Sequence, residues 1–339
     1  AVATCRILRQ MIVTRRTFLA GLLPVATVAT SPAASWSQPR ARLGYLSGGR
    51  KDDNAANTLD ILRAALRELG WRAGDNLLIE ERWSGGDSAS LPRLARELVA
   101  QRPDVLACTG TTETRVLQAA TGTIPIVFLQ VAADPVTAGF VQTIVRPGRN
   151  ITGFTQAPQF LWSKRIALLT DVLGRPPRRL AWLGNPGNTT TATSWPDARD
   201  AAAQFKCDVI RVDAGARADL ERAFEMIKGR DALLVQFDFL FAVERRRIAE
   251  LAARHRIPAI YENRMQVLGG GLMSYGADLR ENYRQGAGYV HRILNGAMVG
   301  DLPVVQPSRF EFVLNLKAAR ALGLKVTPAF LARADEVVE

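Results

Sequence analysis

The chain repeats one order of segments in its two halves. In each half a short apolar run is followed by a second run with an aspartate at or next to its start and a third that contains a proline. The copies span residues 42–47, 103–109 and 124–128, then 179–184, 231–236 and 257–261. The matched positions, Arg42 with Arg179, Asp104 with Asp231 and Ile124 with Ile257, lie 137, 127 and 133 residues apart. A nearly constant offset predicts two similar lobes, and two lobes joined side by side form a cleft suited to a small molecule.

Within each half, strand-like and helix-like segments alternate. Leu59, Leu62, Leu66 and Leu69 recur at helical spacing and end at Gly70, which predicts a helix with a glycine stop. Further helices are predicted over residues 91–99 and 113–120. Strands are predicted over residues 77–83, 105–107 and 126–128, and in the second half over 180–184, 208–212, 232–236 and 258–261. Such alternation is typical of α/β lobes, each with a parallel sheet flanked by helices.

Segments that follow the two copies are expected to connect the lobes. Residues 150–155 follow the first copy and residues 269–276 the second; a helix over about 278–294 and a strand over 310–315 come later. We therefore expect lobe 1 to comprise 41–154 plus about 277–308, and lobe 2 to comprise 155–274 plus about 309–339. Three crossings near Thr155, Tyr275 and Phe312 would form a multi-segment hinge.

The first 38 residues read as an export signal. Arg15 and Arg16 precede an apolar stretch over 19–29 that ends in small residues, an arrangement that resembles the twin-arginine signal. The stretch is short for a membrane span, and cleavage is expected by about Ser37. Met11 is a more plausible start than Ala1, so residues 1–10 are expected to be an upstream extension. An amphipathic or disordered leader without export is the alternative.

The distribution of charge and of cysteine bears on nucleic-acid binding, membrane binding and thiol chemistry. The net charge is +12, and four arginines within residues 1–38 account for a third of it. The cluster at 245–247 is flanked by glutamates, so we interpret it as a solvated helix face; an anionic-membrane or nucleic-acid patch is the alternative. Cys108 and Cys207 fall in different lobes and are expected to be buried, unpaired thiols rather than a disulfide, metal ligands or catalytic groups.

Candidate binding residues follow the predicted strands, because ligands of parallel sheets bind beyond the carboxyl ends of strands. The first half places Ser47, Thr109, Thr111, Thr112 and Asp134 in such turns. The threonines open a helix, where free backbone N–H groups could hold a carboxylate; ordinary N-capping is the alternative. The matched turn of the second half contains Phe237 and Asp238, which could seat a side chain and a polar group, unless the aromatic residues are core.

Signatures of catalysis are few. His255 and His291 are the only histidines, and both are expected to be structural or solvent-facing. There is no nucleophile elbow, no dinucleotide or phosphate loop after a strand, and no spacing typical of metal ligands. The sequence therefore predicts a protein that is not an enzyme and that uses no catalytic residue, metal or cofactor.

Several motifs together resemble the exported solute-binding proteins of ABC importers, in the tryptophan- or tyrosine-type group. The matching segments are 43–47 (LGYLS), 124–128 (IPIVF), 134–136 (DPV), 146–153 (RPGRNITG), 270–276 (GGLMSYG) and 315–324 (NLKAARALGL). The resemblance covers residues 41–339. It implies the type I periplasmic-binding-protein fold, closure of the lobes on a ligand, and docking onto a membrane ABC permease. The chain departs from the family's usual pattern at 130–133 and 237–241, beside the expected cleft.

The resemblance and the turn residues together predict a periplasmic receptor that captures a small polar solute, an amino acid or similar compound. We expect a soluble monomer with no nucleic-acid partner. In this interpretation the threonine turn holds the carboxylate of the solute, with Ser47 and Tyr275 nearby, and Asp238 accepts from its ammonium. A periplasmic sensor or chemotaxis receptor on the same fold, or an exported α/β enzyme, is the alternative.

Overall fold

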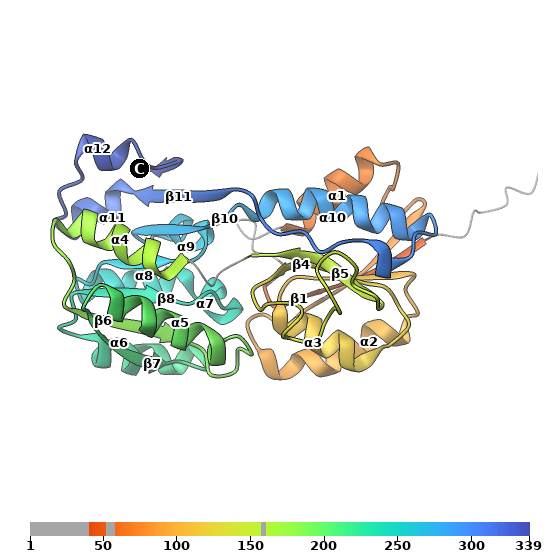
Figure 1. Cartoon of the computed structure of the whole chain (residues 1–339), viewed down its shortest axis with the longest axis horizontal. Helices are drawn as coiled ribbons and strands as arrows, with labels where there is room; N and C mark the ends of the chain where they lie inside the picture. Colours follow the sequence, from red (N-terminus) through yellow and green to blue (C-terminus); the bar gives the residue numbers. More distant parts are fainter. Residues whose placement is uncertain (1–40, 52–57, 157–160) are drawn as a thin grey trace, which may run out of the picture. The chain divides into compact units, whose positions relative to one another are not determined.

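The protein was analysed as a computed structural model, which describes residues 41–51, 58–156 and 161–339. The predicted export signal, residues 1–38, lies outside the described residues. The described elements form two sheets with the helices packed against them (Figure 1). Within these ranges no helix is long and apolar enough to cross a membrane.

The first sheet is wholly parallel and has the strand order β2-β1-β3-β4-β5. Its strands are β1 (Ala41–Ser47), β2 (Leu77–Trp83), β3 (Val105–Cys108), β4 (Ile126–Val131) and β5 (Ile151–Thr155). The sequence treated 150–155 as a connection, and the structure corrects this, because residues 151–155 pair with β4 as a fifth strand.

Helices cover both faces of the first sheet, as Figure 1 shows. They are α1 (Thr58–Glu68) and α10 (Leu279–Leu294) on one face, and α2 (Leu91–Ala100) and α3 (Thr111–Ala120) on the other. The apolar residues of α1 predicted from the leucine spacing are buried against the sheet together with α10. A helix from late in the chain therefore completes the core of the first lobe.

The second sheet has seven strands in the order β12-β11-β10-β9-β8-β6-β7. They are β6 (Arg179–Gly184), β7 (Asp208–Asp213), β8 (Ala232–Val235), β9 (Ala259–Tyr261), β10 (Met273–Ala277), β11 (Phe310–Asn315) and β12 (Glu336–Val338). Helices α4 (Leu161–Leu173), α5 (Thr191–Gln204), α11 (Leu316–Ala321) and α12 (Pro328–Leu331) share one apolar core with it. Helices α6 (Leu220–Ile227), α7 (Phe239–Val243) and α8 (Arg245–Arg254) contribute to another, and α9 (Arg264–Leu268) is a short helix after β9.

The second sheet is not wholly parallel, which corrects the sequence prediction. Strand β11 pairs antiparallel with β10, and β12 is an additional edge strand that the sequence did not predict. The reversal follows from connectivity. The chain leaves the carboxyl end of β10, forms α10 on the first sheet, and re-enters the second sheet beside that same end of β10.

The predicted repeat is visible in matched hydrogen bonds. The carboxylate of Asp104 accepts from the backbone N of Arg42 at 2.7 Å. The carboxylate of Asp231 accepts from the backbone N of Arg179 at 2.9 Å. Each aspartate thereby joins the start of one strand to the start of its neighbour. The first strands of the two sheets are therefore aligned in the same way, and their carboxyl ends lie at equivalent positions.

Two smaller predictions have mixed outcomes. Cys108 and Cys207 are both buried and unpaired, as expected. The arginine cluster is only partly a solvated face: Arg246 is exposed, but Arg245 is buried and donates to the carbonyl of Ala242 at 2.8 Å. Arg247 pairs with Glu221.

Candidate functional site

Two adjoining cavities lie where the turns after the strands of the two sheets meet. The smaller cavity is lined by residues of the β1, β2, β3 and β4 turns and by Asn188, Thr190 and residues 237–240. The larger cavity is lined by Ser47, Gly49, Arg50, Trp83 and residues of α9, α10 and β11. Gln130, Phe237 and Phe239 line both, so the two cavities are neighbouring parts of one cleft.

The two cavities differ in size. The smaller has a volume of about 40 Å³, enough for a few water molecules at about 10–15 Å³ each. The larger has a volume of about 240 Å³. Of the two, the larger cavity therefore offers the room that a ligand of many atoms requires.

The threonine turn already has internal partners. Helix α3 begins at Thr111, whose hydroxyl oxygen accepts from the backbone N of Ala132 and Ala133 at 3.0 and 3.2 Å. The hydroxyl of Thr112 lies 3.3 Å from that of Thr189, which belongs to the second lobe. Thr109 is buried and lines neither cavity. Thr111 thus fixes the end of β4, and Thr112 joins the two lobes.

Glu113 occupies the anion-binding position at the start of α3. Its buried carboxylate accepts from the backbone N–H groups of Gly48, Gly110 and Glu113 itself. Burial raises the pKa of this carboxyl from 4.5 to about 7; the charge of Asp238 adds to the increase, and the backbone donors oppose it. The donors that the sequence assigned to the carboxylate of a solute therefore already hold the protein's own carboxylate.

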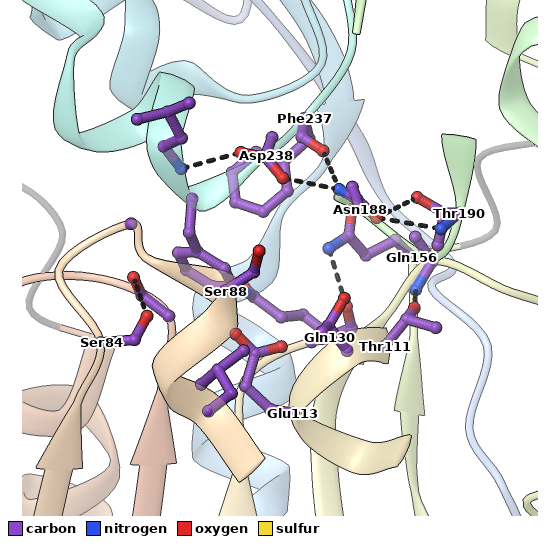
Figure 2. A pocket seen from close by; sticks show the side chains of 18 residues that line it. Ser84, Ser88, Thr111, Glu113, Gln130, Gln156, Asn188, Thr190, Phe237 and Asp238 are labelled. Atoms are coloured by element: carbon purple, nitrogen blue, oxygen red, sulfur yellow. Dashed lines mark hydrogen bonds between the residues drawn. The ribbon is translucent and has the colours of Figure 1, made fainter. Parts of the chain in front are cut away.

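Asp238 is also fully engaged (Figure 2). It caps α7 by accepting from the backbone N of Leu240 at 2.9 Å. The side-chain amides of Asn185 and Asn188 donate to its two oxygens, each at 2.9 Å. Burial raises its pKa, while these donors oppose the increase. Asp238 lines the smaller cavity with its charge already hydrogen-bonded, so it can act on a ligand chiefly through its negative potential.

An aromatic wall follows from the two phenylalanines that flank this aspartate. The rings of Phe237 and Phe239 pack edge-to-face with centroids 5.3 Å apart. Both are half-buried, and both line the two cavities. They therefore belong to the cleft and not to the core, where Phe241 lies instead.

The larger cavity combines apolar walls with charged groups. Ile61, Trp83, Phe237, Phe239 and Met265 provide the apolar part. A few polar groups on a largely apolar surface are typical of a small-molecule site.

The charged wall of the larger cavity is an ion-pair network. Glu311 lies 3.0 Å from the guanidinium of Arg280 and 3.6 Å from that of Arg264. Arg280 also pairs with Asp278 at 2.8 Å. Arg50 is exposed at the mouth and has no carboxylate partner within the described part of the chain. Arg50 is therefore a cation available to an anionic group.

The sequence-predicted site residues divide into two groups. Ser47 lines the larger cavity, Thr111, Thr112 and Asp238 line the smaller, and Phe237 lines both. Thr109, Asp134 and Tyr275 line neither. Asp134 accepts from the backbone N of Val136 and Thr137 and so caps its own turn. The ring of Tyr275 stacks on Phe310 with centroids 6.3 Å apart, and its carbonyl accepts from Arg165 at 2.9 Å.

Sequence reasoning missed several cleft residues that its own rule could have found. Trp83 and Ser84 stand at the end of β2, Asn188 follows β6, and Asn263 follows β9. The rule does not identify Arg280 and Glu311, because these residues lie in the segments that cross between the lobes and not in turns after parallel strands.

Comparisons with known proteins identify the family and the fold of the chain. The family described as ABC transporter substrate binding protein matches residues 51–338. A protein named "Tyrosine-binding protein" from Clostridioides difficile (strain R20291) is 24% identical over 262 residues, which are 77% of this chain and 75% of that protein. A conserved domain protein of Vibrio cholerae has a crystal structure with a TM-score of 0.79 and 27% identity, covering 88% of this chain and 99% of that one. An ABC domain in complex with L-Trp from Streptococcus pneumoniae has a TM-score of 0.79 and 22% identity, covering 88% and 100%.

Proposed function

The chain belongs to the family of ABC transporter substrate-binding proteins, and we propose that its cleft captures an amino acid with an aromatic or large apolar side chain for import. The observation that carries this proposal is the larger cavity, whose apolar part includes Trp83, Phe237 and Phe239 and whose mouth contains Arg50, which has no carboxylate partner among the described residues. The ligands named for two relatives, tyrosine and L-Trp, support the same class of compound.

The charges of the cleft suggest how the polar end of the amino acid lies. The residues that line the smaller cavity include two carboxylates, Glu113 and Asp238, and no lysine or arginine among those described. A negative potential favours the ammonium there. Gly48 lines the smaller cavity, and Gly49 and Arg50 line the larger, so the turn after β1 joins them. We place the carboxylate at Arg50, in place of the threonine turn, and the side chain against the aromatic wall.

Calorimetric titration with single amino acids tests this proposal. Phenylalanine, tyrosine and tryptophan are expected to bind more tightly than alanine or glutamate. Arg50→Ala should weaken the binding of the aromatic amino acids at least tenfold, about 1.4 kcal/mol, because the carboxylate loses its charged partner. Arg67→Ala, an exposed arginine of α1 that lines neither cavity, should bind like the wild type.

A ligand without the carboxylate charge makes this experiment specific. Wild type should prefer phenylalanine to phenylalanine amide, and Arg50→Ala should lose most of that preference. Equal discrimination by both proteins would remove Arg50 from the site. Failure of every amino acid to bind would overturn the proposed ligand class.

Delivery of the ligand to a membrane permease follows from the family, and we propose that the protein acts outside the cytoplasm as a non-enzymatic monomer. The leader at 1–38 supports export by the twin-arginine route. Replacing Arg15 and Arg16 by lysine is expected to leave the precursor in the cytoplasm, as measured by cell fractionation and N-terminal sequencing. Unchanged export of the double variant would count against this route.

A further inference from the structure

Phe239 of the second lobe sits in a cradle of three glycines from the first lobe. A Cβ atom added to Gly48 would lie closer than 3.0 Å to the Phe239 ring, which real Cβ atoms do not tolerate. A Cβ at Gly110 would lie 3.3 Å from the ring, and one at Gly49 would lie 3.8 Å from it, an ordinary contact. Glycine is the residue that permits such close approach.

The cradle continues onto the backbone beside Phe239. Gly86, in the turn after β2, has a positive φ of 92°. A Cβ there would lie 3.0 Å from the Cα of Leu240. The turns after β1, β2 and β3 therefore all close around the first residues of α7, with the tightest approach at Gly48 and narrow clearances at Gly86 and Gly110.

The position of the ring is fixed from its own side as well. Asp238, directly before it, is held by the amides of Asn185 and Asn188 and by the backbone N of Leu240. Phe237 packs edge-to-face against the ring. These contacts hold the backbone on either side of Phe239 and give its ring a packing partner in the second lobe. Phe239 also lines both cavities, so it stands where the smaller and larger cavities adjoin.

We propose that Phe239 determines ligand specificity, because its ring, seated in the glycine cradle, divides the cleft and limits the size of the side chain that the closed lobes accept. This inference rests on the proposed function and deepens it. With the ring in place, a ligand side chain is confined to the larger cavity. Without it, the two cavities become one space, and bulkier side chains fit while the lobes still close.

Ligand size is the measurement that tests the division of the cleft. Wild type should bind phenylalanine at least tenfold more tightly than 2-naphthylalanine in calorimetric titrations. Phe239→Ala should lower that ratio at least tenfold, and Phe239→Leu should lie between the two. If Phe239→Ala binds phenylalanine and keeps the wild-type ratio within threefold, the inference is wrong. Absence of amino-acid binding by the wild type would instead overturn the proposed function.

The distance between the lobes in the ligand-free protein tests whether the glycine cradle permits closure. Spin labels at Arg96→Cys and Asp200→Cys, both exposed and in different lobes, report the distance between lobes by pulsed electron spin resonance. Cys108 and Cys207 are buried, and Cys5 is replaced by serine. Gly48→Ala should shift the distribution to longer distances, whereas Gly49→Ala, whose Cβ has room, should leave it unchanged.

A double variant identifies the group that blocks closure. A Cβ at Gly48 would also crowd the carboxylate of Glu113, within the same lobe. If the ring of Phe239 is the obstacle, Gly48→Ala combined with Phe239→Ala should restore the short distance of the Phe239→Ala single variant. A double variant as open as Gly48→Ala alone, or no shift in Gly48→Ala, would show that the cradle does not control closure.

Discussion

Replacing Arg165 by methionine is expected to lower the free energy of unfolding by about 3–5 kcal/mol, the usual cost of removing one partner of a buried ion pair. Arg165 is 1% exposed. Its guanidinium lies 3.4 Å from the buried carboxylate of Glu262 and donates to the carbonyl of Tyr275 at 2.9 Å. Methionine would leave both the carboxylate and the carbonyl without this donor.

The same ion pair connects the crossing strand to the cleft. Burial lowers the pKa of Arg165, and the charge of Glu262 opposes that change. The other oxygen of Glu262 accepts from the backbone N of Phe237 at 3.0 Å. Strand β10, which leads out of the second sheet, and the aromatic turn of the site are thereby held by one arginine. We expect Arg165→Met to weaken ligand binding as well as stability.

Urea unfolding with a paired variant separates the ion pair from simple loss of packing. Arg165→Met combined with Glu262→Gln removes both charges and keeps an oxygen for Phe237, so it should recover at least half of the lost stability. Asp171→Asn, which breaks a surface pair with Arg333, should cost at most about 1 kcal/mol. An Arg165→Met variant within 1 kcal/mol of wild type would refute the assigned role.

The sequence predicted those parts of the fold that depend on local pattern. The repeat places Asp104 and Asp231 correctly because each aspartate acts on an adjacent strand start within its own lobe. The strand β12 and the reversed direction of β11 were missed. The direction of β11 depends on how the chain returns from the first sheet, and β12 is a three-residue strand paired with β11 at the edge of the second sheet. Residue periodicity carries no information on strand direction.

The site was predicted less completely, for a different physical reason. The turn rule finds residues at the ends of strands, such as Ser47 and Phe237, and they do line the cleft. It does not reveal which polar groups the protein uses internally. Glu113 fills the helix N-terminus that appeared free in the sequence, and Thr111 serves the β4 turn. Competition between a ligand and the chain's own side chains becomes visible only in three dimensions.

Replacing Glu113 by glutamine is expected to remove a pH dependence of stability between about pH 4.5 and 7. Burial raises the pKa of Glu113 from 4.5 to about 7 in the folded protein. Between these values the folded state binds more protons than the unfolded state, so stability falls as the pH rises. The destabilisation caused by ionising Glu113 is absent below about pH 4.5 and reaches about 3 kcal/mol above pH 7.

Urea unfolding at a series of pH values measures this effect as a difference between proteins. From pH 4.5 to 8, wild type should lose about 3 kcal/mol relative to Glu113→Gln, because glutamine does not ionise. Asp238→Asn retains an oxygen to cap α7 but removes the charge that helps raise the Glu113 pKa. The folded-state pKa of Glu113 is then lower, so the variant's loss of stability should level off at a lower pH and be smaller than in the wild type. A wild-type profile parallel to that of Glu113→Gln would contradict the assignment.

Ligand binding should act on the same proton. If the ammonium of an amino acid enters the smaller cavity beside Glu113 and Asp238, its positive charge favours the ionised carboxylate and lowers the pKa of Glu113. Binding near pH 7 should then release protons, so the measured enthalpy should vary with the ionisation enthalpy of the buffer. Glu113→Gln should show little of this variation. A wild-type binding enthalpy that does not vary with the buffer would place the ammonium elsewhere in the cleft. The position of the carboxylate at Arg50 is tested separately, by the titrations of Arg50→Ala.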